Sequence, residues 1–160
     1  MEEIHLVNGR GVAVISEEDA ELVVSAGPWY LLPGKISYAT AVVECVNRRN
    51  SFVLMHRLIL AAKRGQRIDH RDRNGLNNQR MNLRFCTQSQ NMANREMPPR
   101  LDHLGNHLPK GVSFDRSRRK YRADIELKGR HYFSPRFCTI EESHAWYRAK
   151  AAELFGEFAR

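Results

Sequence analysis

A polar stretch of 29 residues, from Arg67 to Arg95, constrains this chain more than any other part of its sequence. It reads RIDHRDRNGLNNQRMNLRFCTQSQNMANR, holds six asparagines and carries no acidic residue after Asp72. Asparagine is a poor filler for strands and for the middle of helices, because its amide competes with the backbone for hydrogen bonds. So many asparagines indicate either a solvated loop or an ordered polar site.

The local patterns of this stretch predict the order strand, loop, strand, helix. RIDH and NLRFC are the two strands, and the turn after the first strand ends at Gly75. SQNMANR is the helix, which Thr87 and Gln90 begin as a capping box. This layout places a strand end and a helix start within reach of each other.

Three side chains of the layout suit hydrolytic chemistry. Asp69 and His70 lie at the strand end, and Asn91 lies in the first turns of the helix. Carboxylate and amide oxygens are ligands that Mg²⁺ and Mn²⁺ prefer. A histidine titrates near neutral pH and can accept a proton from an attacking water. The residues therefore predict a metal-assisted hydrolytic site.

The same stretch has two alternative interpretations. A calcium loop fails, because aligning Gly75 with the invariant loop glycine puts His70 at the first ligand position and Met81 at the last, acidic one. Alternatively, the asparagines are turn formers and His70 is an ordinary surface histidine. This second interpretation is adequate for a single histidine or asparagine, but it explains the combination of all these residues less well than an ordered site does.

The ordered segments resemble the HNH homing endonucleases of bacteriophages over roughly residues 54–97. The matching segments are MHRLI (55–59), DH (69–70), NG (74–75), NNQRMNLR (77–84) and SQNMANR (89–95). The resemblance implies a ββα-metal core in which Asp69 and Asn91 bind one divalent ion, Mg²⁺ or Mn²⁺, and no zinc is expected. His70 would be the general base and Asn82 the residue that holds the loop and orients the site.

The resemblance extends to further residues. Asn91 stands where the motif usually has its last histidine, a substitution that occurs within the family. His56 also matches a family position, for which packing on its own helix is the alternative role. Candidate contacts to the phosphates that flank the cut are Arg71, Arg73, Arg80 and Arg84.

The segments on either side complete the predicted organisation. Residues 1–53 form a small α+β segment, with a hairpin around Asn8-Gly9 and a short helix capped by Ser16 and Asp19 that ends at Gly27. HRLILAAKRG is a further helix that Gly65 stops. The proline- and glycine-containing residues 98–109 form a linker. Residues 110–160 supply three strands and a helix that begins with a capping box of Thr139 and Glu142.

This last region resembles the apetala / ethylene-response-factor DNA-binding domain of plants over residues 110–158. The resemblance rests on GVSFD, KYRADI, the pattern F-x-T-x-E-E at 137–142 and AAELFGEF. It implies a three-stranded antiparallel sheet packed on one helix, and we expect that packing through Ala145, Ala149 and Leu154. The predicted DNA contacts are Ser113, Arg116, Arg118, Arg119, Lys120, Arg122, Arg130 and His131. The plant domains carry arginines where this chain has Ser113 and Asp115, so their base contacts do not transfer directly.

Charge and composition agree with a nucleic-acid partner. The formal net charge of +8 is divided unevenly, with −3 over residues 1–50, +6 over 51–97 and +5 over 98–160. Basic surfaces bind polyanions by releasing condensed counterions. Cys45, Cys86 and Cys138 form no CxxC pair, which favours a reducing compartment. No apolar stretch is long enough to cross a membrane, and the N-terminus does not read as a secretory signal.

Together these patterns predict an α+β DNA endonuclease that cuts double-stranded DNA as a monomer or weak dimer. The expected setting is the cytoplasm of a phage-infected or prophage-carrying bacterium. The competing hypothesis is a non-catalytic, sequence-specific DNA-binding regulator, and an RNA-binding protein is a third. The sequence leaves open the target site, the choice between a nick and a double-strand break, and the role of residues 1–50.

Overall fold

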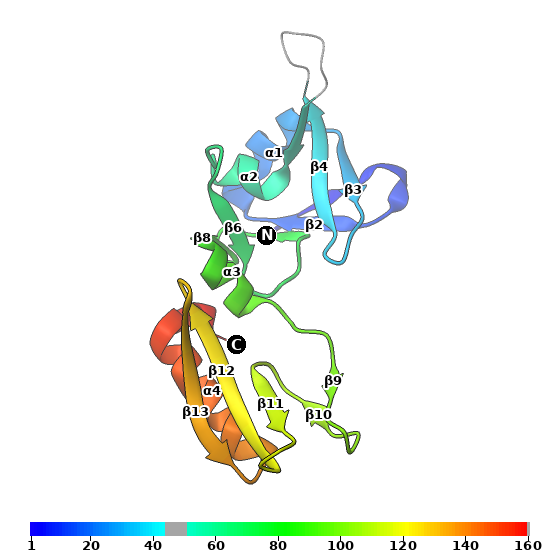
Figure 1. The fold of residues 1–160 in the computed structure, drawn as a ribbon. Helices are drawn as coiled ribbons and strands as arrows, with labels where there is room; N and C mark the ends of the chain where they lie inside the picture. Colours follow the sequence, from blue (N-terminus) through cyan, green and yellow to red (C-terminus); the bar gives the residue numbers. More distant parts are fainter. Residues whose placement is uncertain (44–50, 160) are drawn as a thin grey trace. The chain divides into compact units, whose positions relative to one another are not determined.

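The computed structural model describes residues 1–43 and 51–159 (Figure 1). Contacts divide the chain into two compact units, Met1–Thr87 and Gln88–Arg160. Both units combine helices with small sheets, so the predicted α+β class is confirmed. Cys86 and Cys138 are free thiols, and Cys45 lies outside the described residues. Within the described ranges, every helix is too short or too polar to cross a membrane.

The first unit opens with the predicted antiparallel hairpin. Strands β1 (Glu2–His5) and β2 (Val12–Ile15) pair, and a 3-10 turn at Val7–Gly9 lies in their connection. The Leu6 N–H donates to the Gly11 carbonyl and closes the loop. Alternate residues of β2 enter the core, because side chains along a strand point to opposite faces.

The next element is a 3-10 turn (Glu17–Asp19) that leads into helix α1 (Ala20–Ala26). Gly27 ends the helix as predicted. The predicted capping box of Ser16 and Asp19 is wrong, because neither side chain caps this helix. Ser16 Oγ instead accepts from the Arg80 backbone N–H, and the Asp19 carboxylate accepts from the Arg80 guanidinium. Long-range partners have replaced the local ones.

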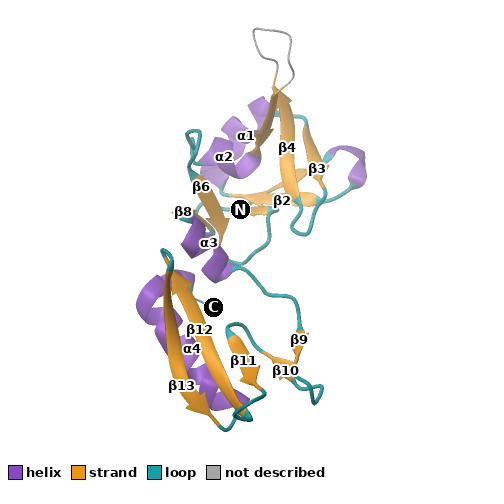
Figure 2. Ribbon diagram, viewed as in Figure 1, coloured by secondary structure: helices purple, strands orange, loops and turns teal. Residues whose placement is uncertain are grey.

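A three-stranded antiparallel sheet follows in the order β3-β4-β5, formed by β3 (Trp29–Leu32), β4 (Tyr38–Val43) and β5 (Ser51–Leu54). Helix α2 (Met55–Ile59) comes directly after it and lies beside α1 (Figure 2). This helix is shorter than predicted. Ala61 takes a positive φ of 46°, a left-handed conformation that ends the helix well before Gly65.

The N-terminal segment and the polar stretch share one hydrophobic core. The core residues come from both parts of the first unit and are Leu6, Ala13, Ile15, Val23, Trp29, Ala39, Ala41, Met55, Ile59 and Leu83. Strand β7 (Asn77–Asn78) also pairs in parallel with β2, with Val14 opposite Asn77. Residues 1–43 therefore complete the fold around the polar stretch.

The polar stretch has the predicted order of elements. Strands β6 (Arg67–His70) and β8 (Leu83–Cys86) are antiparallel, with Asp69 opposite Arg84 and His70 opposite Leu83. Helix α3 (Gln88–Asn94) follows and belongs to the second unit. Lys110 lies at the C-terminal end of α3, where its ammonium group donates to carbonyls that include those of Met92 and Arg95.

The segment predicted as a linker carries a short hairpin, in which β9 (Arg100–Leu101) pairs with β10 (His107–Leu108). Its turn is held by Asp102, which accepts from the backbone of Leu104 and Asn106. The Tyr121 hydroxyl donates to the same carboxylate at 2.9 Å. These residues therefore pack onto the sheet of the second unit.

That sheet has the order β11-β12-β13, from β11 (Val112–Asp115), β12 (Lys120–Leu127) and β13 (Arg130–Phe137), and α4 (Ile140–Phe155) covers one face (Figure 1). A 3-10 turn at Gly156–Phe158 follows the helix. The predicted capping box of Thr139 and Glu142 at the start of α4 is confirmed.

Two of the three residues predicted to pack α4 on the sheet do not do so, and the third, Leu154, is half-buried. Ala145 and Ala149 are exposed, whereas Ser143, Tyr147 and Ala151 are buried. Gly111 supplies the reason, because a Cβ atom at this position would collide with the Tyr147 ring. The missing side chain makes room for a large ring, so the tyrosine, and not the alanines, turns toward the sheet.

Candidate active site

His70 ends β6 as a buried side chain with a fixed partner. It is 5% exposed, and its Nε2 lies 3.3 Å from Oδ1 of Asn78. The Asn78 amide is oriented by its other end, because Nδ2 donates to the Leu76 carbonyl. An amide oxygen only accepts hydrogen bonds, so the contact places the ring proton on Nε2. Nδ1 is then the basic nitrogen of His70.

Two further rings surround His70. The His56 ring, from α2, lies with its centroid 5.0 Å from that of His70 in an edge-on arrangement, and the Tyr38 ring, from β4, lies at 5.8 Å. His56 is 7% exposed, and its Nδ1 has no hydrogen-bond partner within the described part of the chain. The sequence resemblance marked His56, whereas Tyr38 carries no local signal.

Asp69 lies beside His70 and is paired with Arg84 across the two strands. Nε and Nη2 of Arg84 donate to Oδ2 of Asp69 at 2.9 and 2.8 Å. Both side chains are 7% exposed, so this ion pair is buried. Arg84 was predicted to hold a phosphate, but the structure directs its guanidinium to the neighbouring carboxylate.

Asn82 locks the loop between the two strands. Its Oδ1 accepts from the Asp72 backbone N–H at 3.0 Å, and its Nδ2 donates to Asp72 Oδ1 and to the Asn77 carbonyl. The Asn77 side chain donates to the other Asp72 oxygen at 2.7 Å, and the Asn74 backbone N–H also reaches Asp72. The loop asparagines are thus ordered partners of one carboxylate and not a solvated tract.

Gly75 lets this loop approach β4 closely. A Cβ atom on Gly75 would lie 2.6 Å from the Tyr38 ring and would also overlap the Ser37 carbonyl. Such distances do not occur between real atoms, so the position admits only glycine. The loop that follows His70 is therefore pressed against the strand that supplies the neighbouring Tyr38 ring.

Burial shapes the electrostatics of the site. It lowers the pKa of His70, against the opposing effects of the Asn78 hydrogen bond and of the Asp72 and Asp69 charges. It also lowers the pKa of His56 to about 3, with smaller contributions from His70 and Arg57. Both histidines are therefore neutral near pH 7, the state in which a histidine can act as a base.

Burial raises the pKa of the Tyr38 hydroxyl, and the Asp69 charge adds to this effect. Tyr38 is therefore a neutral neighbour of His70. The pKa of Asp72 lies below its usual value, although burial alone would raise it, because hydrogen bonds from Asn74, Asn82 and Asn77 stabilise the charged form. The loop carboxylate consequently stays ionised.

Asp69 supplies a carboxylate, a ligand type that hard divalent cations prefer, and its Oδ2 accepts hydrogen bonds from Nε and Nη2 of Arg84. A metal-binding carboxylate is commonly held by a hydrogen-bonding neighbour of this kind. The second predicted ligand, Asn91, is carried by α3. Within the described residues no three His, Cys, Asp or Glu side chains come together to hold a metal ion.

The other predicted phosphate contacts of the first unit have diverse surroundings. Arg71 and Arg73 follow His70 and are half-buried, and Arg73 takes a positive φ of 67°. Arg80 joins two carboxylates of the N-terminal segment, Asp19 at 2.7 Å and Glu18 at 3.1 Å. Its predicted phosphate contact would compete with these pairs.

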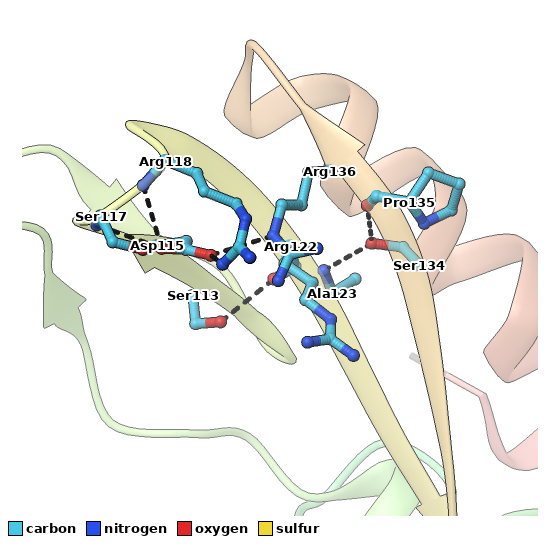
Figure 3. Close-up of polar contacts among 9 residues, drawn as sticks. All are labelled: Ser113, Asp115, Ser117, Arg118, Arg122, Ala123, Ser134, Pro135 and Arg136. Atoms are coloured by element: carbon cyan, nitrogen blue, oxygen red, sulfur yellow. Dashed lines mark hydrogen bonds and ion pairs between the residues drawn. The ribbon is translucent and has the colours of Figure 1, made fainter.

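In the second unit the predicted DNA contacts gather on the sheet face opposite α4 and at the turns. Arg116, Arg119 and Lys120 are exposed at the turn between β11 and β12, where Arg118 reaches Asp115. Ser113 Oγ donates to the Arg122 carbonyl on this face (Figure 3). His131 lies 3.2 Å from Asp124, and the Arg130 guanidinium lies over the Tyr132 ring. Sequence reasoning missed the pairing of several of these cations.

Comparison with known proteins gives one relative at useful similarity. The chain is 31% identical over 156 residues to an uncharacterized HNH endonuclease of Acanthamoeba polyphaga mimivirus. The alignment covers 96% of this chain and 76% of the relative. No family model matches the chain, and no solved structure matches it.

Proposed function

The chain belongs to the HNH endonuclease family, and on that premise we propose that it hydrolyses phosphodiester bonds of double-stranded DNA with His70 as its general base. The observation that carries the proposal is the 3.3 Å contact between Nε2 of the buried His70 and the Asn78 amide oxygen. Asn78 holds its Nε2 proton, burial keeps the ring neutral, and Nδ1 is the nitrogen that can accept a proton.

In the proposed reaction, Nδ1 of His70 takes a proton from the water that attacks phosphorus in line with the leaving 3′-oxygen. Positioned bases of this kind contribute roughly 10²–10⁴-fold to a rate. Asn78 prevents rotation of the ring, and the Asn82 network holds the loop that follows it. These interactions preserve the geometry of the base between turnovers.

Asp69 and Asn91 are the residues that we propose to hold one Mg²⁺ or Mn²⁺ ion. The bound ion would stabilise the negative charge that develops on the phosphate and the leaving oxygen. Arg84 fixes the orientation of the Asp69 carboxylate by donating two hydrogen bonds to its Oδ2. Arg71 and Arg73, in the loop that follows His70, are the candidates in this unit for contacts to flanking phosphates.

The second unit is proposed to bind the DNA, as its resemblance to the apetala / ethylene-response-factor domain implies. Its three-stranded sheet has one face covered by α4 and the other lined by polar and basic side chains, with exposed arginines at the turn after β11. A tethered DNA-binding unit raises the local concentration of DNA at the nuclease site. By resemblance, the biological role would be that of a free-standing homing endonuclease of a phage or prophage.

A cleavage assay tests the catalytic proposal. Wild type and His70→Ala would be incubated with supercoiled plasmids that carry fragments of the genome encoding the chain, each with Mg²⁺ and with EDTA. Wild type with Mg²⁺ should give relaxed or linear product, and the other three reactions should give none. A relaxed product would mean a nick, and a linear product a double-strand break.

A binding measurement on the same plasmid fragments separates the alternatives. His70→Ala should retard DNA as strongly as wild type, because His70 is buried and contributes no phosphate contact. If wild type retarded DNA but cleaved none in the presence of Mg²⁺, the competing function, a DNA-binding regulator, would replace the nuclease. Equal cleavage by His70→Ala would remove His70 from the role of base.

A further inference from the structure

The exposed face of the sheet in the second unit carries an aromatic side chain with a cation over it. Phe133 is 53% exposed, and the guanidinium carbon of Arg122 lies 3.9 Å from the centre of its ring. The His131 ring lies nearly parallel to the Phe133 ring, with an interplanar angle of 11° and centroids 5.7 Å apart. Arg122, Phe133 and His131 therefore form one stacked group on the face opposite α4.

Within the part of the chain that the structure describes, Arg122 has no acidic partner, unlike its charged neighbours. Arg136 and Arg118 both reach Oδ2 of Asp115, at 2.9 and 3.4 Å. In Figure 3 dashed lines join Asp115 to these two arginines and to Ser117, and none joins it to the guanidinium of Arg122. Among the described residues Nε of Arg122 is buried without a hydrogen-bond partner, and its guanidinium enters no ion pair.

The local fold of β13 places this group. Pairing with β12 shifts between Arg122 and Asp124, a bulge that takes up Ser134 and Pro135. Pro135 has no N–H to donate to the ladder, and within the bulge Ser134 Oγ accepts a hydrogen bond from the Ala123 N–H (Figure 3). The bulge keeps Phe133 on the outer face, opposite Asp124, while Ser134 turns into the core.

A guanidinium stacked on a ring is held in one orientation and keeps its Nη donors available. Two parallel N–H groups match O6 and N7 of guanine in the major groove, the commonest specific contact of arginine with DNA. An ordinary phosphate contact needs neither the ring nor the fixed plane, because lysine serves it equally as a point charge. The stack therefore favours base recognition over backbone contact.

Resting on the proposed DNA-binding function of the second unit, we propose that Arg122 reads a guanine in the major groove and that Phe133 is its positioning residue. Ser113 and Asp115 stand where the plant domains have arginines, and Arg122 lies on the middle strand of this sheet. Asp115 pairs with Arg136, the residue opposite Arg122 on β13, and with Arg118, so the charges of both neighbours are compensated.

The test is a selection of binding sites from a randomised duplex DNA library, carried out with the full chain bearing His70→Ala to prevent cleavage. The same selection would be run with Arg122→Lys, Phe133→Leu and Phe133→Tyr added separately. Arg116→Ala is the control, since it removes an exposed turn arginine and leaves the stack intact. The salt dependence of affinity would be measured for each variant on the selected sequence.

Arg122→Lys keeps the charge, so the slope of log affinity against log salt concentration (the salt slope) should be unchanged. The same variant should reduce the preference for guanine at one position by roughly 5- to 150-fold. Phe133→Leu should weaken the same preference, and Phe133→Tyr, which retains the ring face, should preserve it. Arg116→Ala should lower the salt slope by about 0.9 and leave the selected motif intact.

Two results would overturn the inference, and only one of them would also reject the proposed DNA-binding function of the second unit. A motif that is identical with wild type, Arg122→Lys and Phe133→Leu would reject Arg122 as the base reader and leave the DNA-binding function standing. Recovery of no motif by the His70→Ala chain would reject both the reader and the proposed sequence-specific function of the second unit.

Discussion

Arg84→Ala should destabilise the first unit strongly, because it leaves Asp69 buried without its counter-charge. Two guanidinium N–H groups reach Asp69 Oδ2 at 2.8 and 2.9 Å, and both side chains are 7% exposed. Removing one partner of a buried ion pair typically costs about 3–5 kcal/mol. In a unit of this size each kcal/mol lowers Tm by about 4–8 °C, so Tm should fall by about 12 °C or more.

The assay follows tryptophan fluorescence during thermal and urea unfolding. Trp29 is buried in the core of the first unit, and the other tryptophan, Trp146, belongs to the second, so a Trp146→Phe background reports on the first unit alone. Arg84→Met combined with Asp69→Leu should recover much of the loss, because an apolar pair leaves no buried charge. Arg116→Ala, at an exposed turn, should change stability by no more than about 0.5 kcal/mol.

One result would refute this reasoning. Arg84→Ala could have the same Tm as wild type, while the slope of log affinity against log salt concentration became shallower by about 0.9. Arg84 would then contact a phosphate, as the sequence predicted. The ion pair with Asp69 would then contribute little to stability. Equal stability of the single and the double variants would also contradict the expected cost of an unpaired Asp69.

Three further predictions concern the surroundings of His70. The pKa of His56 is about 3 in the folded chain and 6.5 in the unfolded chain. Between pH 6.5 and pH 3 only the unfolded chain therefore binds this proton. The free energy of unfolding should fall by about 1.4 kcal/mol for each pH unit in this range. His56→Phe should remove that part of the slope in urea titrations at several pH values. Gly75→Ala should lower Tm and disturb the Tyr38 aromatic signal in near-ultraviolet circular dichroism, and an unchanged signal would mean that the loop gives way. Asn78→Ala should reduce kcat by about 10²-fold or more at unchanged DNA affinity and shift the His70 tautomer seen by ¹⁵N NMR, whereas an unchanged tautomer would assign Asn78 a role in folding only.

Local patterns in the sequence predicted most of the secondary structure correctly. The order of β6, β8 and α3, the first hairpin and the three strands before α4 all follow from patterns a few residues long. The capping box of Thr139 and Glu142 was predicted correctly because both partners lie within one turn. Such features depend on hydrogen bonds and periodicity that neighbouring residues settle among themselves.

Features that depend on distant partners were not predictable in this way. Ser16 and Asp19 have the spacing of a capping box, yet both bind Arg80, more than sixty residues away in the chain. The inner face of α4 is decided by the space above Gly111, which Tyr147 fills. In each case a contact from elsewhere in the fold sets the local arrangement.

The sequence by itself determined the residue types of the candidate site, because Asp69, His70, Asn82 and Asn91 stand in an order that resembles one family of nucleases. Only the tertiary structure decided what each side chain contacts within its unit. It gave His70 its tautomer through Asn78, and it directed Arg84 to Asp69. The reason is physical: a charge or a ring acquires its partner from burial and from strand register, which the whole fold sets and no short segment contains.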